Sequence, residues 1–374
     1  MLKAVGIISE YNPFHNGHLY HIKKAKALTH ADICVVLMSG NWVQRGQPAI
    51  LDKWDRTQMA LDNGADLVLE LPFQFAVQPV DIFAKYSVNI LGSLNCTWLS
   101  FGSENPNLNF YELSKILVND HKLFQDYNHT YSSLIKTAFL NKTGVMIDSP
   151  NDTLGLNYAT YNNELNNSMK LVPIKRKDSN HSDTELSFDS ISSASSIRKN
   201  IKQFQKIAPF VPQKTFDLLK NHQCINWNVF WDYLKYKILT SSLDDLKNIY
   251  QMNEGLEHRF KKYIYESNDF EHFLNKLKTK RYTYARLRRL CVYTLLNFKR
   301  SDFFKSQQYV RILGFNGLGR SYLRQEKKHV NMEVISKPNK KLLSNELLFD
   351  YRAGNVYSIA SEKYEDLYRI PLIF

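Results

Sequence analysis

Residues 3–18 read KAVGIISEYNPFHNGH, and this stretch decides the fold of the N-terminal part of the chain. Residues 3–9 are mostly apolar and few, which is typical of a buried β-strand. After the polar loop, apolar residues recur at helical spacing, at Leu19, Ile22, Ala25 and Leu28. They predict a helix over 17–28. A short apolar strand that leads through a loop into a helix indicates the first half of a parallel β-α-β unit.

The same alternation continues along the chain. Further apolar strands are expected at 33–39, 66–72, 96–102 and 171–176, with helices at 52–64 and 80–94. Strands that are apolar throughout are typical of a parallel sheet covered on both faces. With right-handed crossovers, the predicted fold class is α/β, a doubly wound parallel sheet. Ligands bind such sheets at the carboxyl ends of the strands, here within 9–18, 39–52, 72–79 and 102–105.

Two histidines stand at the mouth of the first helix. His15 and His18 bracket Asn16 and Gly17, and a spacing of three places both rings on one side of the first turn. Together with the unpaired N–H groups of a helix N-terminus, they predict a cradle for a triphosphate. The chain has no G-x-x-x-x-G-K-[ST] and no G-x-G-x-x-G after the first strand, so P-loop and dinucleotide motifs are excluded. A structural role for the histidines, or half a metal site, are alternatives. No HEXXH or Cys/His cluster completes a metal site, and none is predicted.

Two motifs now carry a family resemblance. Asn16-Gly17-His18 after His15 resembles the [HT]-x-G-H signature of HIGH-type nucleotidyltransferases, and ISSASSIR (191–198) resembles their I-S-S-x-x-I-R motif. Longer stretches resemble the bacterial tRNA(Met) cytidine acetate ligase family over nearly the whole chain: EYNPFHNGHLYH, MSGNWVQRGQPAILDKWDR, DLVLELP, FGSEN, PNDTLG, GFNGLGR and LLFDYRAGNVYSIA. The resemblance implies a Rossmann-like catalytic domain.

The resemblance also implies a reaction in two steps. ATP and acetate form acetyl-adenylate and pyrophosphate, and the acetyl group then moves to N4 of the wobble cytidine of elongator tRNA(Met). His15 and His18 would contact the phosphates and stabilise the transition state, whereas Ser195, Ser196 and Arg198 would hold the leaving pyrophosphate. Mg²⁺ is the expected counterion of the triphosphate, although no cluster of carboxylates in the sequence indicates its site.

The family's ATP contacts transfer to residues of the first strand and loop and to three later positions. They are Ile7, Ile8, Ser9, Glu10, Tyr11, Asn12, Pro13, Phe14, His15, Asn16, Gly17, His18, Leu19, Tyr20, Gly102, Asn151 and Arg176. The family often has a second Asn where this chain has Asp152. A helix N-cap at Asn151-Asp152, for a helix over 154–165, is an alternative interpretation, and Arg176 could be a surface arginine.

A third block, 39–56, also resembles the family. We hypothesise that Arg45, Asp52 or Lys53 binds acetate or the tRNA end, at the carboxyl edge of the second strand. Asp52 could instead cap the helix that follows it. The polar stretch 178–190 is expected to be a loop or flap, and whether it closes over the nucleotide stays open.

The positive charge of the chain is concentrated in one segment. The formal net charge is +13, yet residues 1–200 carry 18 basic and 19 acidic side chains. Residues 272–330 alone carry 15 basic and 2 acidic ones. We therefore predict two domains: 1–200 as the ATP-binding catalytic domain and 201–374 as a mainly helical, basic tRNA-binding domain. A polyanion such as RNA or a membrane surface fits the charge, and the nucleotidyltransferase motifs favour RNA.

Arginines with interleaved tyrosines predict where RNA binds. The candidates are Arg281, Arg286, Arg288, Arg289, Arg320 and Arg324. Guanidinium groups pair with phosphates and tyrosine rings stack on unpaired bases. A merely solvated face is the alternative. GFNGLGR at 314–320 could present amides to a phosphate or form a simple turn.

The cysteines and the apolar runs indicate the compartment, and two other functions remain to be considered. Cys34, Cys96, Cys224 and Cys291 have no metal or CxxC spacing, so we expect reduced core cysteines and a cytoplasmic protein. No apolar run is long enough to span a membrane. Two other functions stay open on the residues alone: a small-molecule nucleotidyltransferase, which would leave the basic part unexplained, and a non-catalytic RNA-binding protein with a nucleotide pocket.

Overall fold

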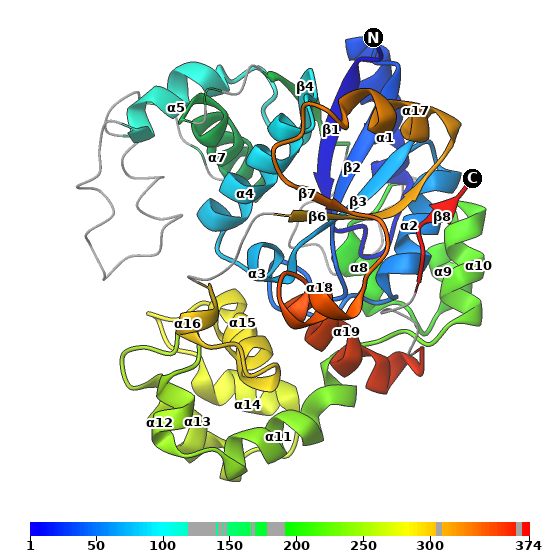
Figure 1. Ribbon diagram of the computed structural model, residues 1–374. Helices are drawn as coiled ribbons and strands as arrows, with labels where there is room; N and C mark the ends of the chain where they lie inside the picture. The colour runs from blue at the N-terminus through cyan, green and yellow to red at the C-terminus, as the bar shows by residue number, and fades with distance from the viewer. Residues whose placement is uncertain are drawn as a thin grey trace.

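The computed structural model describes residues 1–118, 140, 144, 147, 149–164, 166, 169–177, 191–303, 309–363 and 369–374. A twisted sheet with helices on both faces forms one part of the molecule, and a bundle of helices lies beside it (Figure 1). The predicted loop at 178–190 lies outside the described residues.

The sheet contains the five strands that the sequence predicts and three more. The strands are β1 (Ala4–Ser9), β2 (Ile33–Ser39), β3 (Leu67–Leu71), β4 (Trp98–Ser103), β5 (Lys170–Lys175), β6 (Tyr309–Phe315), β7 (Glu333–Ile335) and β8 (Leu372–Ile373). Their order is β5-β4-β1-β2-β3-β6-β7, and β8 pairs with β6. The first five strands are parallel, which confirms the doubly wound α/β fold. β6 lies antiparallel to β3 and extends the sheet.

Helices cover both faces of this sheet because its strands are apolar on both sides. Along β2, Cys34, Val36 and Met38 contribute to one core, whereas Ile33, Val35 and Leu37 contribute to the other. The first core takes side chains from α1 (Asn16–Thr29) and α2 (Lys53–Asp62). The second takes them from α4 (Val80–Ser93), α7 (Pro150–Glu164) and α17 (Gly317–Glu326). Shorter helices are α3 (Phe73–Ala76), α5 (Phe110–Val118), α8 (Ala194–Lys199) and α9 (Phe204–Ile207), with a 3-10 turn at Ala208–Phe210.

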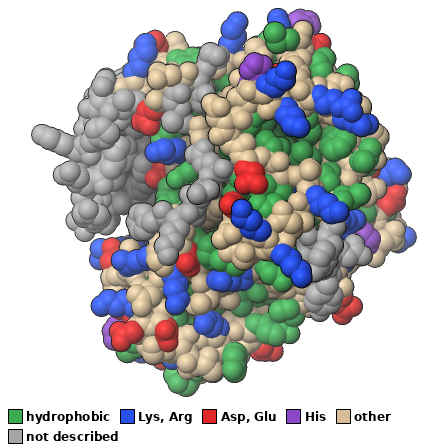
Figure 2. Space-filling view, viewed as in Figure 1, with side chains coloured by type: hydrophobic (Ala, Val, Ile, Leu, Met, Phe, Trp, Pro, Cys, Tyr) green, Lys and Arg blue, Asp and Glu red, His purple; other side chains and the backbone are tan. Residues whose placement is uncertain are grey.

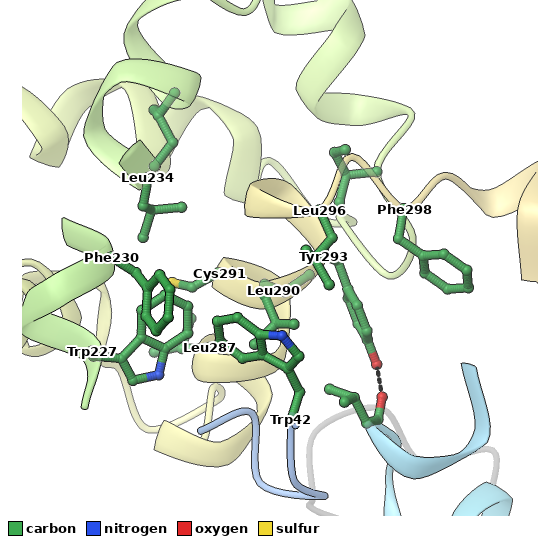
Figure 3. Packing of buried hydrophobic residues seen from close by; sticks show 14 of the residues in the cluster. Trp42, Trp227, Phe230, Leu234, Leu287, Leu290, Cys291, Tyr293, Leu296 and Phe298 are labelled. Atoms are coloured by element: carbon green, nitrogen blue, oxygen red, sulfur yellow. Dashed lines mark hydrogen bonds between the residues drawn. The ribbon is translucent and has the colours of Figure 1, made fainter. Parts of the chain in front are cut away.

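The helical part of the chain has a core of its own. Its elements are α10 (Gln213–Asn221), a 3-10 turn at Trp227–Phe230, α11 (Trp231–Thr240), α12 (Leu243–Lys247), α13 (Leu256–Tyr265), α14 (Phe270–Leu277), α15 (Tyr284–Leu295) and α16 (Arg300–Phe303). Leu287, Leu290 and Cys291 of α15 pack with Trp227 and with Trp42, which comes from the loop after β2 (Figure 3). The Tyr293 hydroxyl donates to the carbonyl oxygen of Val77. Side chains from the loops of the sheet therefore contribute to the core of the helical part.

The C-terminal part of the chain returns from the bundle to the sheet. Residues 309–374 supply β6, β7 and β8 together with α17, α18 (Lys340–Ser344) and α19 (Leu348–Ser361). Residues 201–374 are mainly helical as predicted, but the sequence analysis did not foresee these strands. The division at residue 200 stays a prediction. GFNGLGR is the end of β6 and the start of α17, where the Asn316 side chain caps the helix by accepting from the Gly319 N–H.

Two further expectations concern the cysteines and the membrane. All four cysteines are free thiols; Cys34, Cys96 and Cys291 are buried and Cys224 is half-buried. Among the described residues, no helix combines the length and the apolar composition needed to cross a bilayer.

Candidate active site

A cleft of about 840 Å³ opens at the carboxyl ends of the parallel strands. Its walls come from the loop after β1, α1, the loop after β2, α4, β4, α7, β5, α8 and the start of α15. The predicted residues that line it are Ile8, Ser9, Glu10, Tyr11, Asn12, His15, Gly17, His18, Tyr20, Arg45, Gly102, Asn151, Arg176, Ser195, Arg198, Arg281, Arg286 and Arg289. Those that do not line it are Ile7, Pro13, Phe14, Asn16, Leu19, Asp52, Lys53, Ser196, Arg288, Arg320 and Arg324.

The two signature histidines cap α1 reciprocally. Nδ1 of His15 accepts from the Gly17 N–H at 3.0 Å, and Nδ1 of His18 accepts from the His15 N–H at 3.2 Å. An accepting Nδ1 carries no proton, so each ring is neutral and holds its hydrogen on Nε2. The rings stack with centroids 3.7 Å apart. A Cβ at Gly17 would lie 2.8 Å from Cε1 of His15, so glycine is needed here for the His15 ring as well as for a ligand.

The electrostatic surroundings keep His18 neutral. Burial, with smaller contributions from His15, His21 and Arg176, holds the pKa of His18 well below its ordinary value. Neutral imidazoles with a proton on Nε2 can donate hydrogen bonds to phosphate oxygens without carrying charge. The cradle predicted from the sequence therefore has two preorganised donors.

A third histidine, which the sequence analysis did not single out, lies next to them. His21 follows at the same spacing of three and lines the cleft, so H-x-x-H-x-x-H was the signal that could have revealed it. Its Nε2 contacts the Ser100 hydroxyl at 3.0 Å, and that hydroxyl donates to the Val172 carbonyl oxygen. Nε2 of His21 is therefore the donor. Burial, aided by Arg176, lowers the pKa of His21 to about 4.

The second motif faces the first across the cleft. Ser193 caps α8 by accepting from the Ser196 N–H at 3.1 Å. Arg198 donates to the Asn12 carbonyl oxygen at 2.6 Å and to the Ser195 hydroxyl at 3.2 Å. The structure thus brings Arg198 and Ser195 to the loop that precedes the histidines. Ser196 is fully buried beneath them and does not line the cleft.

Glu104 organises the end of the cleft near β4 and β5. Its carboxylate accepts from Asn151 at 2.5 Å and from Ser149 at 2.6 Å, and it lies 3.4 Å from Nε of Arg176. A Cβ on Gly102 would lie 3.3 Å from Cγ of Arg176, so the arginine packs over this glycine. Gly102, Asn151 and Arg176 are therefore brought together, as the transferred ATP contacts require.

The alternative interpretations at this end are wrong. Asn151 and Asp152 lie in the first turn of α7, which begins at Pro150, so neither is its N-cap. Asp152 instead accepts from the Ser103 hydroxyl at 2.5 Å and from the Glu104 N–H at 3.1 Å. The position where the family often has Asn therefore fixes the loop that carries Glu104. Arg176 is not an ordinary surface arginine, because burial lowers its pKa while Glu104 opposes the shift.

The block at 39–56 divides into cleft and core residues. Asp52 caps α2 by accepting from the Trp54 and Asp55 N–H groups, each at 2.8 Å, so the capping interpretation is confirmed. Lys53 is 1% exposed and pairs with Glu70 at 2.7 Å, inside the core. Of the three candidates Arg45, Asp52 and Lys53, only Arg45 lines the cleft. Successive helix positions point in different directions, which is why neighbours in sequence separate in space.

A buried arginine of the block 39–56 holds the floor of the cleft. Arg56 is 0% exposed, and it donates to the carbonyl oxygens of Glu10 at 2.7 Å, Ser39 at 3.0 Å and Gly40 at 2.5 Å. It therefore ties the end of β1 to the end of β2. Oε1 of Glu10 also accepts from the Gln44 N–H at 2.9 Å.

The candidate RNA-binding arginines do not form one surface. Arg281 and Arg286 pair with Glu254 at 2.9 and 3.6 Å, and Arg288 lies 3.8 Å from Glu271. Exposed pairs of this kind contribute about 0–1 kcal/mol, so they yield readily to a phosphate. Figure 2 shows acidic side chains among the basic ones over the helical part of this face.

Arg320 and Arg324 lie away from the cleft. β6 runs antiparallel to β3, and its end at Phe315 pairs with Leu67, the first residue of β3. α17 therefore begins at the amino edge of the parallel strands. Its Gln325 hydrogen bonds with the backbone of Leu2, just before β1. The cleft is at the opposite edge, so these two candidates lie apart from those of α15 that line it.

Comparisons with known proteins agree with this geometry. A family model described as HIGH Nucleotidyl Transferase matches residues 2–368. The chain is 40% identical over 375 residues to the tRNA(Met) cytidine acetate ligase of Lactiplantibacillus plantarum, covering 99% of this chain and 98% of that protein. It is 41% identical over 387 residues to the enzyme of the same name from Leuconostoc mesenteroides, covering 99% of each.

Solved structures extend the agreement to three dimensions. Thermotoga maritima TmcAL in its apo form superposes with a TM-score of 0.91 at 28% identity, over 100% of both chains. The same protein bound with alpha-thio ATP superposes with a TM-score of 0.89 at 27% identity, again over 100% of both chains. The chain belongs to the tRNA(Met) cytidine acetate ligase family of HIGH nucleotidyltransferases.

Proposed function

We propose that the protein activates acetate with ATP and transfers the acetyl group to N4 of the wobble cytidine of elongator tRNA(Met). The observation that carries the proposal is the cleft itself. His15 and His18, which cap α1, line the cleft together with Ser195 and Arg198, and these groups suit adenylate formation. The arginine-rich start of α15 forms another wall. Family membership supplies the substrates, because the curated relatives are named tRNA(Met) cytidine acetate ligases.

In the first step an acetate oxygen attacks the α-phosphorus and pyrophosphate leaves. No protein nucleophile is needed, so the chain's residues position and stabilise charge. Nε2–H of His15 and of His18 donates to phosphate oxygens as charge develops on them. Arg198 and Ser195 hold the departing pyrophosphate. Gly102, Asn151 and Arg176 hold the nucleoside end of ATP.

In the second step N4 of cytidine attacks the acetyl carbon, the bond to AMP breaks, and N4 loses a proton. Among the described residues that line the cleft, Glu10 is the only acidic one, and eight are basic. The eight are Arg45, Lys175, Arg176, Lys177, Arg198, Arg281, Arg286 and Arg289. We assign the proton to Glu10, whose carboxylate suits the N4 amino group as a hydrogen-bond partner. Gln44 and Arg56 hold Glu10 in place.

Magnesium and acetate need separate comment. The described residues contain no group of three or more His, Cys, Asp or Glu side chains that could hold a metal ion. The chain does not supply a Mg²⁺ site of its own there, and we derive no step through the ion. For acetate we retain Arg45, the one member of the 39–56 candidates that lines the cleft.

The test is acetate-dependent exchange between ATP and labelled pyrophosphate, followed by nucleoside mass spectrometry of tRNA(Met) after incubation with ATP and acetate. We expect exchange only with acetate and N4-acetylcytidine only with both substrates. Exchange driven by a phosphorylated small molecule in place of acetate would support a small-molecule nucleotidyltransferase. Absence of exchange with intact tRNA binding would support a non-catalytic RNA-binding protein.

A further inference from the structure

Arg289 is a buried arginine without an anionic partner. It lies in the second turn of α15, is 7% exposed, and lines the cleft. Its Nε is fully buried with no hydrogen-bond partner, and its guanidinium forms no ion pair with any residue that the structure describes. Asp81 at the start of α4 bears on it electrostatically without pairing to it. A buried charge in this state is costly for a folded protein, so it indicates a ligand that completes it.

Neighbouring residues pack against the helix on either side of Arg289. Leu287, Leu290 and Cys291 occupy the apolar side of α15 and pack beside Trp42 and Trp227 (Figure 3). The loop after β2 presses against the helix backbone. A Cβ at Gly46, which has a φ of +71°, would lie 2.3 Å from the Arg289 nitrogen. The backbone of Arg289 is therefore held between two parts of the molecule.

The start of α15 adds further positive potential. This helix has 12 residues, and Thr283 caps it by accepting from the Arg286 N–H. Its first turn contains no acidic residue. Thr283, Ala285 and Arg286 line the cleft with Arg289. The first-turn N–H groups that Thr283 does not cap, beside two guanidinium groups, are a favourable environment for a phosphate.

The exposure of the cleft-lining arginines falls from the segment before α15 into its second turn. The exposed fraction falls from 49% for the Arg281 side chain, through 28% for that of Arg286, to 7% for Arg289. The three arginines thus form a track from the surface into the cleft. A strand with a phosphate at each nucleotide fits such a track, whereas the triphosphate of ATP has its own donors at α1 and α8.

We propose that Arg289, together with Arg286 and the N-terminus of α15, binds a backbone phosphate of the tRNA strand that brings cytidine into the cleft. This subsite rests on the proposed function and deepens it. The sequence suggested that Arg289 is part of an exposed RNA-binding face; its assigned role is instead inside the cleft, next to the reacting nucleotide.

The experiment compares Arg289→Gln with Arg324→Gln, which removes an arginine on α17 at the opposite edge of the sheet. Filter binding of tRNA(Met) transcripts at several salt concentrations is combined with pyrophosphate exchange. For Arg289→Gln we expect at least tenfold weaker tRNA binding and a salt slope smaller by roughly 0.7–0.9, the value for one phosphate contact. The ATP KM in exchange should change less than twofold. Arg324→Gln should match the wild type in both assays.

Several outcomes would overturn the subsite. A raised ATP KM with unchanged tRNA binding would assign the phosphate to ATP, and no change in either assay would make Arg289 structural. Two further variants keep the test valid if Arg289→Gln fails to fold. Arg289→Lys keeps the charge and should retain most of the salt slope. Arg286→Gln should reduce the slope. Wild-type protein that binds tRNA but forms no N4-acetylcytidine would refute the proposed function and leave the binding assays of the subsite valid.

Discussion

Nδ1 of His18 accepts a hydrogen bond from the backbone N–H of His15 at 3.2 Å. His18 is therefore part of the helix cap, and His15 reciprocates by accepting from the Gly17 N–H. Each imidazole uses Nδ1 for the fold, and the proposed function assigns its Nε2–H to a phosphate oxygen. The capping contact and the proposed phosphate contact belong to the same side chains in the first turn of α1. A substitution that retains only the capping contact can therefore separate the two roles.

The first prediction separates capping from phosphate contact at His15. Asn is a favourable N-cap residue, so His15→Asn should retain the start of α1 while removing the Nε2 donor. We expect pyrophosphate exchange to fall by about 10²–10³-fold, the effect of losing one preorganised donor, with a thermal midpoint close to the wild type. His15→Ala should lose comparable activity and about 1 kcal/mol of stability as well. Exchange within tenfold of the wild type in His15→Asn would contradict the phosphate role.

The second prediction concerns pH and His21. Its pKa is lowered to about 4 in the folded protein, so the unfolded chain binds an additional proton between the ordinary value and about pH 4. The contribution of His21 to stability is complete above pH 6.5 and is lost as the pH falls through this range. Urea titrations from pH 7 to pH 4 should show a shallower decline for His21→Gln than for the wild type. Parallel declines would mean that His21 titrates normally in the fold.

The third prediction tests the buried ion pair between Lys53 and Glu70. Lys53 was one of the candidates for acetate binding. Lys53 and Glu70 are 1% and 3% exposed, and buried Arg311 lies 3.9 Å from Glu70, so removing Lys53 leaves the carboxylate with only this more distant partner. Lys53→Met should lower the free energy of unfolding by about 3 kcal/mol, and the double variant with Glu70→Leu should recover part of this loss. The acetate KM of the folded fraction should not change. A selective rise in acetate KM would restore the role inferred from the sequence.

The fourth prediction assigns the two chemical steps to different groups. Glu10→Gln retains the size and the acceptor oxygen of the side chain but cannot take a proton at neutral pH. We expect acetate-dependent exchange within about threefold of the wild type, and transfer to tRNA slower by about 10²-fold or more, the usual contribution of a general base. Single-turnover transfer at neutral pH, which isolates the second step, is the second readout.

A parallel loss of both steps in Glu10→Gln would show that Glu10 serves ATP instead. Glu104→Gln is the matched comparison, because Glu104 contacts Asn151 and Arg176 at the other end of the cleft. Its substitution should impair exchange at least as much as transfer. The two glutamates therefore distinguish nucleotide binding from acetyl transfer.

The sequence by itself determined the parallel sheet and the position of its ligand edge. Apolar runs such as 33–39 and the His15–His18 motif are local patterns, and their meaning depends on residues close by in the chain. The family resemblance, now confirmed, also followed from contiguous motifs. For the same reason Asp52 could be recognised from the sequence as a possible helix cap.

Only the tertiary structure decided which charges face the cleft. β6 joins a strand more than 200 residues earlier, and this pairing carries Arg320 and Arg324 to the wrong edge for the cleft. Lys53 pairs with Glu70 in the core, and the loop after β2 packs against α15, where Arg289 is buried in the wall of the cleft. Local periodicity shows which side chains share a face, whereas contacts between distant segments decide what that face meets. The fold therefore decided how deeply each charged side chain is buried and which group it contacts.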